Sequence, residues 1–145
     1  MATTWILVAH RSGARIFATR PGERQLNLVE DIDHAVGRLQ AHELESDRSG
    51  RSFDSMGDQR HGMAKEESPT EHLAVAFAGD LAARMKTAHE AKRFDKLVLV
   101  AGPKMLGHLR DALDKHTAAA VSASLDKDLG ETPEHELPAH LAGVL

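Results

Sequence analysis

The sequence has 145 residues, of which 41% are hydrophobic and 28% are charged, and its formal net charge is −4. This length and balance predict one globular domain spanning residues 1–145. The chain has no cysteine, which excludes disulfides, thiolate zinc sites and cysteine nucleophiles. Only 3% of the residues are aromatic and there is no basic excess, so a stacking surface for single-stranded nucleic acid is not expected.

The first third of the chain predicts a three-stranded antiparallel meander. The continuous apolar run Trp5-Ile6-Leu7-Val8-Ala9 is typical of a strand that is covered on both faces. Gly13 interrupts this run, and the alternation that follows indicates a hairpin. After a turn at Pro21-Gly22, a third strand is expected, with Leu26, Ile32 and either Leu28 or Val29 pointing inward. The three strands are expected near residues 4–10, 14–19 and 25–32.

The next segment changes character. Residues 35–44 predict a short helix, but residues 46–65 contain three glycines, four serines and charges of both signs with almost no apolar periodicity. Long segments of this kind in compact domains are commonly functional loops or disordered. We therefore expect a long exposed loop at residues 46–66, projecting from the sheet as the most mobile part of the fold.

A strong helix start follows the loop. In Ser68-Pro69-Thr70-Glu71, the serine can cap the helix, the proline suits the first helical position and the glutamate completes a capping box. Large apolar residues then recur at intervals of four, which predicts an amphipathic helix to about Arg93. The residues expected to face inward are Leu73, Phe77, Leu81 and Met85, with Ala74, Ala78 and Ala88 beside them.

The last third predicts alternating strands and helices. A buried strand is expected at residues 96–101, a helix opening at Gly102-Pro103, a last strand at 119–125 and a C-terminal helix from Thr132-Pro133, which Pro138 complicates. Strand-helix-strand order implies parallel pairing with a right-handed crossover. The fold class is therefore α/β: a mixed five-stranded sheet with helices on both faces, in the order β-β-β-α-α-β-α-β-α.

Metal and cofactor sites are not expected. Two-metal nuclease chemistry needs converging carboxylates, normally including one on the first strand, and the first strand here has none. Asp95, Asp126 and Asp128 lie at strand ends and could converge on one edge, but we predict no divalent metal there. The ten histidines show no ligand spacing, and His42, His89 and His135, each followed by glutamate, are expected to be solvated helix residues.

Two places could bind anions. Gly102 and Lys104 lie at a predicted helix N-terminus, where free backbone N–H groups favour a phosphate; the simpler interpretation is that Pro103 only starts the helix. The long loop carries Arg48, Arg51, Arg60, His61 and Lys65, but Asp47, Asp54 and Asp58 nearly cancel their charge, so a solvated loop of mixed charge is the default interpretation.

Several motifs resemble the bacterial host-attachment protein family, and the likeness covers nearly the whole chain. The opening hairpin is similar to that of the family, as are the loop segment Glu45-Ser46-Asp47-Arg48-Ser49-Gly50-Arg51-Ser52-Phe53-Asp54-Ser55 and the strand-to-helix segment at residues 94–107. Leu125-Asp126-Lys127-Asp128-Leu129 resembles the family's last-strand motif. Through this family the chain is similar to the middle domain of archaeal and eukaryotic peptide-release factors and of Pelota. That similarity implies a three-layer, ribonuclease-H-like topology.

The resemblance also draws attention to Gly57-Asp58-Gln59 in the loop. Release-factor middle domains carry a Gly-Gly-Gln tip on a comparable loop, where the glycines let the backbone approach the ester of peptidyl-tRNA. Here Asp58 replaces the middle glycine, and a carboxylate beside an ester under attack opposes the developing negative charge. A chance tripeptide in a mobile loop is therefore favoured over termination-type hydrolysis.

The preferred function is a non-enzymatic interaction protein of the host-attachment family that acts through its long loop. The expected contact residues are Arg48, Arg51, Asp58, Gln59, Arg60 and His61. The alternative is a ribosome- or RNA-associated protein resembling release factors, with a degenerate hydrolytic loop. The sequence leaves open whether the partner is a protein or the ribosome. With no signal peptide and no transmembrane segment visible, a cytoplasmic location without membrane contact is expected.

Overall fold

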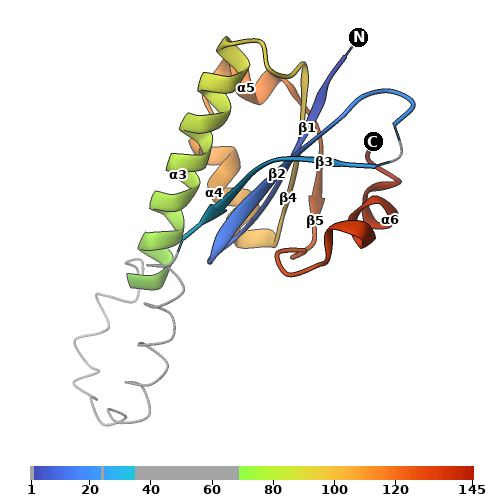
Figure 1. The fold of residues 1–145 in the computed structure, drawn as a ribbon. Helices are drawn as coiled ribbons and strands as arrows, with labels where there is room; N and C mark the ends of the chain where they lie inside the picture. The colour runs from blue at the N-terminus through green and yellow to red at the C-terminus, as the bar shows by residue number, and fades with distance from the viewer. Residues whose placement is uncertain (1, 24, 35–68) are drawn as a thin grey trace, which may run out of the picture.

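The computed structural model describes residues 2–23, 25–34 and 69–145 (Figure 1). Its first two strands, β1 (Thr4–His10) and β2 (Gly13–Thr19), form the expected hairpin. A Cβ atom on Gly13 would lie 2.5 Å from the carbonyl oxygen of Ile32, so a side chain at this position would push the neighbouring strand away. The glycine therefore closes the hairpin and also permits close approach of the third strand.

The third strand, β3 (Asn27–Asp33), lies slightly later in the chain than expected. It pairs with β2, and the register shifts between Ile16 and Phe17, which sets Val29 apart from the regular pairs. Val29 packs against the core whereas Leu28 is 48% exposed. This decides between the two residues that the sequence left open.

Two parallel strands complete the sheet: β4 (Lys96–Ala101) beside β1, and β5 (Val121–Asp126) beside β4. The strand order is β3-β2-β1-β4-β5, which makes the sheet mixed, as predicted. β1 and β4 lie at its centre and their side chains are almost wholly buried, in keeping with their continuous apolar sequences. The ribonuclease-H-like label stays a prediction.

Helix α3 (Pro69–Glu90) begins where the proline signal placed it and buries the expected stripe, with Phe77, Leu81 and Met85 almost inaccessible. It ends a few residues earlier than expected. Lys92 adopts a positive φ of 60°, and the backbone N–H of Arg93 returns to the carbonyl of Ala88. This left-handed residue terminates the helix.

Helix α4 (Pro103–Ala112) also begins at its proline and buries Met105, Leu106 and Leu109. The short helix α5 (Lys115–Ala119) was not predicted, because its residues were divided between a linker and the last strand. Its start is explained by Asp114, whose side chain accepts hydrogen bonds from the backbone of His116 and from the Thr117 hydroxyl. β5 consequently begins two residues later than predicted.

The C-terminal helix was predicted wrongly as one element. A 3₁₀ turn, η2 (Glu134–Glu136), precedes α6 (Leu137–Leu141). Pro138 lies in the first turn of α6, where a missing backbone N–H removes no intrahelical bond. Pro138, which conflicted with a helix beginning at Thr132, is thus accommodated because a separate helix, α6, begins beside it.

The elements form three layers (Figure 1). Helices α3 and α4 cover what we call the first face of the sheet, around Leu7, Leu81 and Leu99. The second face, around Ile6, Val8 and Phe17, is covered by Leu129 and by Leu137 and Leu141 of α6. The predicted helix at residues 35–44, the loop at 46–66 and the Ser68 cap lie outside the described residues.

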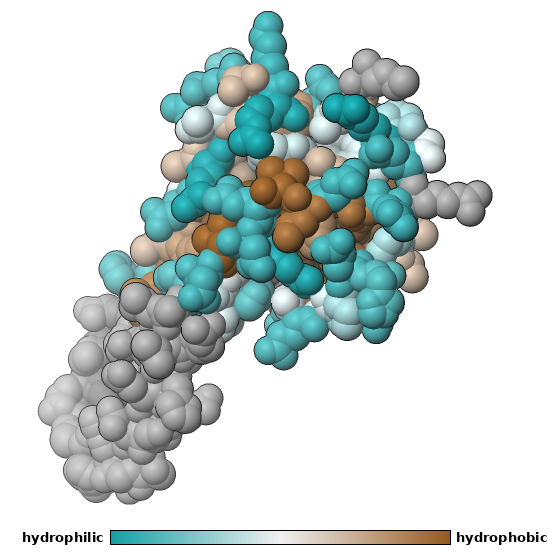
Figure 2. All heavy atoms as spheres, viewed as in Figure 1, coloured by the Kyte–Doolittle hydropathy of each residue, from teal (hydrophilic) through white to brown (hydrophobic). Residues whose placement is uncertain are grey.

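In the part of the chain that the structure describes, helices are either too short or too polar to cross a bilayer. The surface in Figure 2 agrees with this for the side that it shows: hydrophilic side chains surround a smaller apolar area in the middle. Leu28, Val75 and Leu145 are the large apolar residues that the described part of the chain exposes.

Candidate functional site

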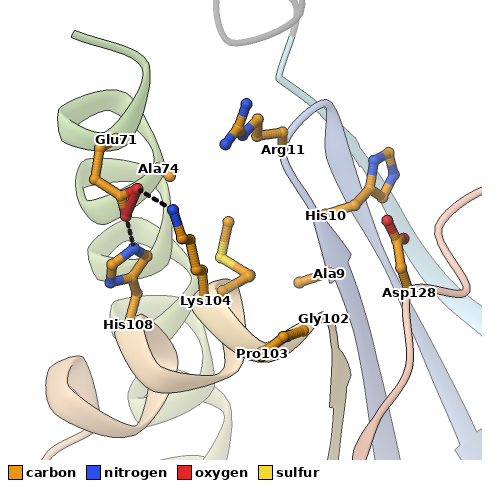
Figure 3. A pocket seen from close by; sticks show the side chains of 11 residues that line it. Ala9, His10, Arg11, Glu71, Ala74, Gly102, Pro103, Lys104, His108 and Asp128 are labelled. Carbon is orange, nitrogen blue, oxygen red and sulfur yellow. Dashed lines mark hydrogen bonds and ion pairs between the residues drawn. The ribbon is translucent and has the colours of Figure 1, made fainter. Parts of the chain in front are cut away.

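A cavity of about 530 Å³ opens at the edge of the sheet where β1 and β4 end (Figure 3). Parallel strands bring their carboxyl ends to one edge, and α/β sheets commonly bind ligands outside that edge. The first turns of α3 and α4 form the opposite wall. The lining residues are Ala9, His10, Arg11, Glu71, Ala74, Gly102, Pro103, Lys104, Met105, His108 and Asp128.

Glu71 joins the two helices across this cavity. Its Oε1 lies 2.5 Å from Nε2 of His108, and its Oε2 lies 3.8 Å from Nζ of Lys104. The side chains of Glu71 and His108 are each only 20% exposed, whereas Lys104 is 78% exposed. The carboxylate therefore holds α3 against α4, and the lysine extends from this pair toward solvent (Figure 3).

His10 lies on the other side of the cavity, beside Asp128 (Figure 3). Its Nδ1 accepts a hydrogen bond of 3.3 Å from the backbone N–H of Ser12. Burial lowers the pKa of His10 below its usual value, and the nearby Asp128 carboxylate offsets this only in part. The ring also packs on Gly130, where a Cβ atom would come within 2.5 Å of it, so Gly130 makes room for the histidine.

The N-terminus of α4 forms the floor between these groups. Gly102 caps the helix with extended backbone angles and has no side chain to accept from the first-turn amides. Among the lining residues, the exposed cations are Lys104 and Arg11, and the acids are Glu71 and Asp128. The formal charges of these four described residues cancel, so the lining has separate positive and negative corners.

The structure places only part of the predicted site. Gly102 and Lys104 line the cavity. The expected loop contacts Arg48, Arg51, Asp58, Gln59, Arg60 and His61 lie outside the described residues.

The three acids considered for a metal do not share one edge. Asp95 lies before β4, where it accepts a 2.8 Å hydrogen bond from the backbone of Thr3. Asp126 and Asp128 lie at the opposite, carboxyl end of the parallel strands. The three acids therefore do not converge, because a residue before a strand and one after its parallel neighbour are a strand length apart. Among the described residues, groups of three or more histidines and acids arranged to hold a metal ion are absent.

Sequence reasoning missed the paired residues of the cavity. Glu71 was interpreted only as a capping residue, and His108 only as one of ten histidines without ligand spacing, yet the two side chains are in contact although they are 37 positions apart in the sequence. The available signal was their placement: Glu71 lies in the first turn of one helix, and His108 lies in the second turn of a helix packed beside it. Of the three histidines that precede glutamates, His135 is exposed as expected, 3.7 Å from Glu136, and His42 lies outside the described residues. His89 was expected to be solvated but is half-buried, because its ring stacks on Phe94.

Comparison with known proteins agrees with the resemblance in the motifs. No curated protein matches the chain at a significant level. A model of the family described as protein required for attachment to host cells matches residues 5–141, which is nearly the whole chain. The chain therefore belongs to this host-attachment family.

Proposed function

We propose that this protein is a non-enzymatic interaction protein for host attachment, with residues 46–66 as its main contact element. The observation that carries the proposal is where the described chain stops before this segment, at His34, and where it resumes after it, at Pro69. We call these two points the joins. Both lie at the edge that holds the cavity, because His34 contacts the carbonyl of Arg11 and the first turn of α3 carries Glu71.

The first join is fixed through His34. Its backbone N–H donates to the carbonyl of Ser12 at 2.8 Å, its Nδ1 lies 2.9 Å from the carbonyl of Arg11, and its ring stacks on Phe77 at 4.1 Å. These contacts tie the end of β3 to the turn after β1 and to α3. Anchoring the residue that precedes a contact segment favours binding, because it limits the conformational entropy lost when the partner binds.

The second join is the first turn of α3, which is fixed by the contacts of Glu71 with His108 and Lys104. The same contacts support a non-enzymatic role. A carboxylate whose two oxygens contact a histidine and a lysine serves to hold two helices together, whereas a general base must be available to a substrate proton. Lys104 and Gly102 also retain their proposed role as a minor anion contact beside the segment, since the lysine is largely exposed.

The test replaces residues 47–64 with a short Gly-Ser linker in the full chain. We expect host attachment by the source organism to be lost while the melting temperature of the purified protein is unchanged. A second variant changes Arg48, Arg51, Gln59 and Arg60 to alanine and is expected to weaken attachment. Its control is Lys96→Ala, which removes an exposed cation at the other end of the sheet and should leave attachment intact.

Full attachment by the linker variant would overturn the proposal, and a fall in its melting temperature would assign the segment a structural role instead. Ribosomes offer a further check. Co-sedimentation of the protein with ribosomes that weakens with salt and depends on residues 47–64 would favour the release-factor-like alternative, because contacts to phosphate are salt-sensitive.

A further inference from the structure

The second face of the sheet ends in a row of polar side chains. Ile6 is paired with Phe17 on one side and with Val98 on the other, and all three are buried in the apolar core of that face. Because successive side chains of a strand alternate between the two faces, the next row on the same face lies two residues away along each strand. Toward the amino ends of β1 and β4, that row consists of direct partners on β2, β1 and β4: Thr19, Thr4 and Lys96.

This row lines a cavity of about 450 Å³, at the opposite end of the sheet from the cavity that Glu71 and Lys104 line. The turn after β2 and the residues that follow α6 form its other walls. The remaining lining residues are Ala2, Arg20, Pro21, Gly22, Glu23, Ser122, Val144 and Leu145. Cavities of roughly 300–1,000 Å³ hold small organic molecules, and a few polar groups fix the orientation of the bound molecule.

Thr19 has a hydroxyl that the fold itself does not use. The residue is only 9% exposed, yet its hydroxyl has no hydrogen-bond partner among the described residues. Buried hydroxyls without a partner are costly, and folded proteins pair most of them. Among the described side chains, the polar atom that is both unpaired and wholly inaccessible is Nε of Arg15, so the Thr19 hydroxyl retains some access, and Thr19 lines the cavity. The hydroxyl is therefore available to a molecule bound there.

Two cations flank this hydroxyl and that of Thr4. Lys96 is the partner of Thr4 in the row, and Arg20 follows Thr19 directly in the chain. Neither cationic side chain forms an ion pair within the described part of the chain. The acidic side chain of the lining, Glu23, accepts the backbone N–H of Arg20 at 2.9 Å and so closes the turn. Unpaired cations beside hydroxyl donors are complementary to an anion with several acceptor oxygens.

We propose that this cavity binds a small organic phosphate. A phosphate monoester carries a charge of about −1.5 to −2 and three acceptor oxygens. Two cations and two hydroxyls match these better than they match a carboxylate, which has one charge and two oxygens. The side chains of Val144 and Leu145 then border the organic part of the molecule.

The phosphate site is a further binding function and does not depend on the attachment role. It lies at the amino ends of β1 and β4, whereas the joins of the contact segment lie at the carboxyl ends of these strands. A change at Lys96 should therefore weaken phosphate binding and leave attachment intact. The two proposals can fail separately.

The test titrates the full chain, labelled with ¹⁵N, with phenyl phosphate and follows the backbone amide resonances by NMR at constant ionic strength. We expect saturable shifts at residues 3–5, 19–23 and 96–97, and much weaker shifts with benzoate, which has the same ring and a carboxylate. Lys96→Gln should raise the dissociation constant about tenfold, because it removes a charge-assisted contact. The matched control is Lys115→Gln, which removes an exposed lysine of α5 outside the cavity and should leave binding unchanged.

Thr19→Val distinguishes a ligand contact from a purely structural threonine. Valine has nearly the same shape and lacks the unpaired hydroxyl, so the melting temperature should hold or rise while the dissociation constant rises roughly tenfold. A structural threonine would not combine these two changes. Absence of saturable shifts at the cavity residues of the wild type would overturn the proposal. So would equal shifts with benzoate, binding that Lys96→Gln leaves intact, or an equal loss in Lys115→Gln.

Discussion

The two faces of the sheet are buried to a similar degree but by different means. On the first face, α3 alone provides 22 residues of regular helix, and α4 packs beside it. On the second face, the cover is the five-residue helix α6, the turn η2 and the irregular chain around Leu129. A long amphipathic helix gains its stability from a continuous apolar stripe, whereas a short cover depends on a few anchors.

Polar contacts supplement the anchors of the second face. The Nη2 group of Arg15 donates to the carbonyl of Leu129 at 2.9 Å and to that of Gly130 at 3.3 Å, and His10 packs on Gly130. An irregular segment has no hydrogen-bond ladder of its own, so the Arg15 side chain of β2 satisfies two of its carbonyls. The comparison shows that one face of a sheet can be covered by helices with a continuous apolar stripe, while the other face is covered by a few buried side chains and individual hydrogen bonds.

The largest expected effect is on the first face. Leu81→Ala removes a fully buried side chain from the middle of α3, and we expect it to lower the free energy of unfolding by about 4 kcal/mol. The helix is held along its whole length, so it cannot move into the space left behind. Urea unfolding measures the effect, and the exposed Val75→Ala in the same helix is the control, with a loss below about 1 kcal/mol.

A smaller loss is expected on the second face. Leu141→Ala also removes a fully buried leucine, but α6 has only five residues, so it can shift into the gap. We expect a loss of about 2–3 kcal/mol in urea unfolding, the lower part of the range for such changes. A loss equal to or greater than that of Leu81→Ala would contradict the proposed difference between the faces.

The polar ties can be tested separately. Arg15→Met keeps much of the side-chain length and removes both hydrogen bonds to the segment at Leu129, with an expected loss of about 1–2 kcal/mol. Hydrogen exchange should become faster at residues 129–141 and stay unchanged in α3. Equal acceleration in both regions would mean that Arg15 supports the whole fold and not the second face in particular.

The smallest effect is a pH dependence at the same segment. Because burial lowers the pKa of His10, the unfolded chain binds a proton at this residue at a higher pH than the folded chain does. Stability from His10 is therefore fully present above the ordinary histidine pKa and is lost as pH falls toward the lowered value. Between about pH 7.5 and 5.5, the wild type should lose more unfolding free energy than His10→Gln, which retains the other histidines. Parallel losses in the two proteins would remove His10 as the cause.

The sequence predicted the first face better than the second. Local periodicity placed α3, and Pro103 placed the start of α4, because an apolar stripe and a helix-starting proline are visible within a single window. The cover of the second face has no periodicity to detect. Leu129, Leu137 and Leu141 are isolated apolar residues. Pro138 could be identified as part of a helix start only once the preceding turn was known.

The cavity was predictable only in part, for a related reason. Gly102 and Lys104 follow a strand directly, so a helix N-terminus at the sheet edge could be expected from the chain order. The contact between Glu71 and His108 depends on how two helices pack side by side. Asp95 was placed correctly at a strand end, but whether it lay near Asp126 stayed open, because both the strand direction and the pairing were needed to decide it.

The central pairing of the sheet also sets the order in which the chain can fold. β1 pairs locally with β2, but its other neighbour is β4, and Thr4 lies opposite Lys96. During synthesis, at about 5–20 residues per second, β1 emerges roughly 5–20 s before this partner. Throughout that interval one edge of β1, whose five central residues are all buried and apolar, has no native neighbour. Nascent chains that end before residue 96 should therefore be the most prone to aggregate and the most dependent on chaperones.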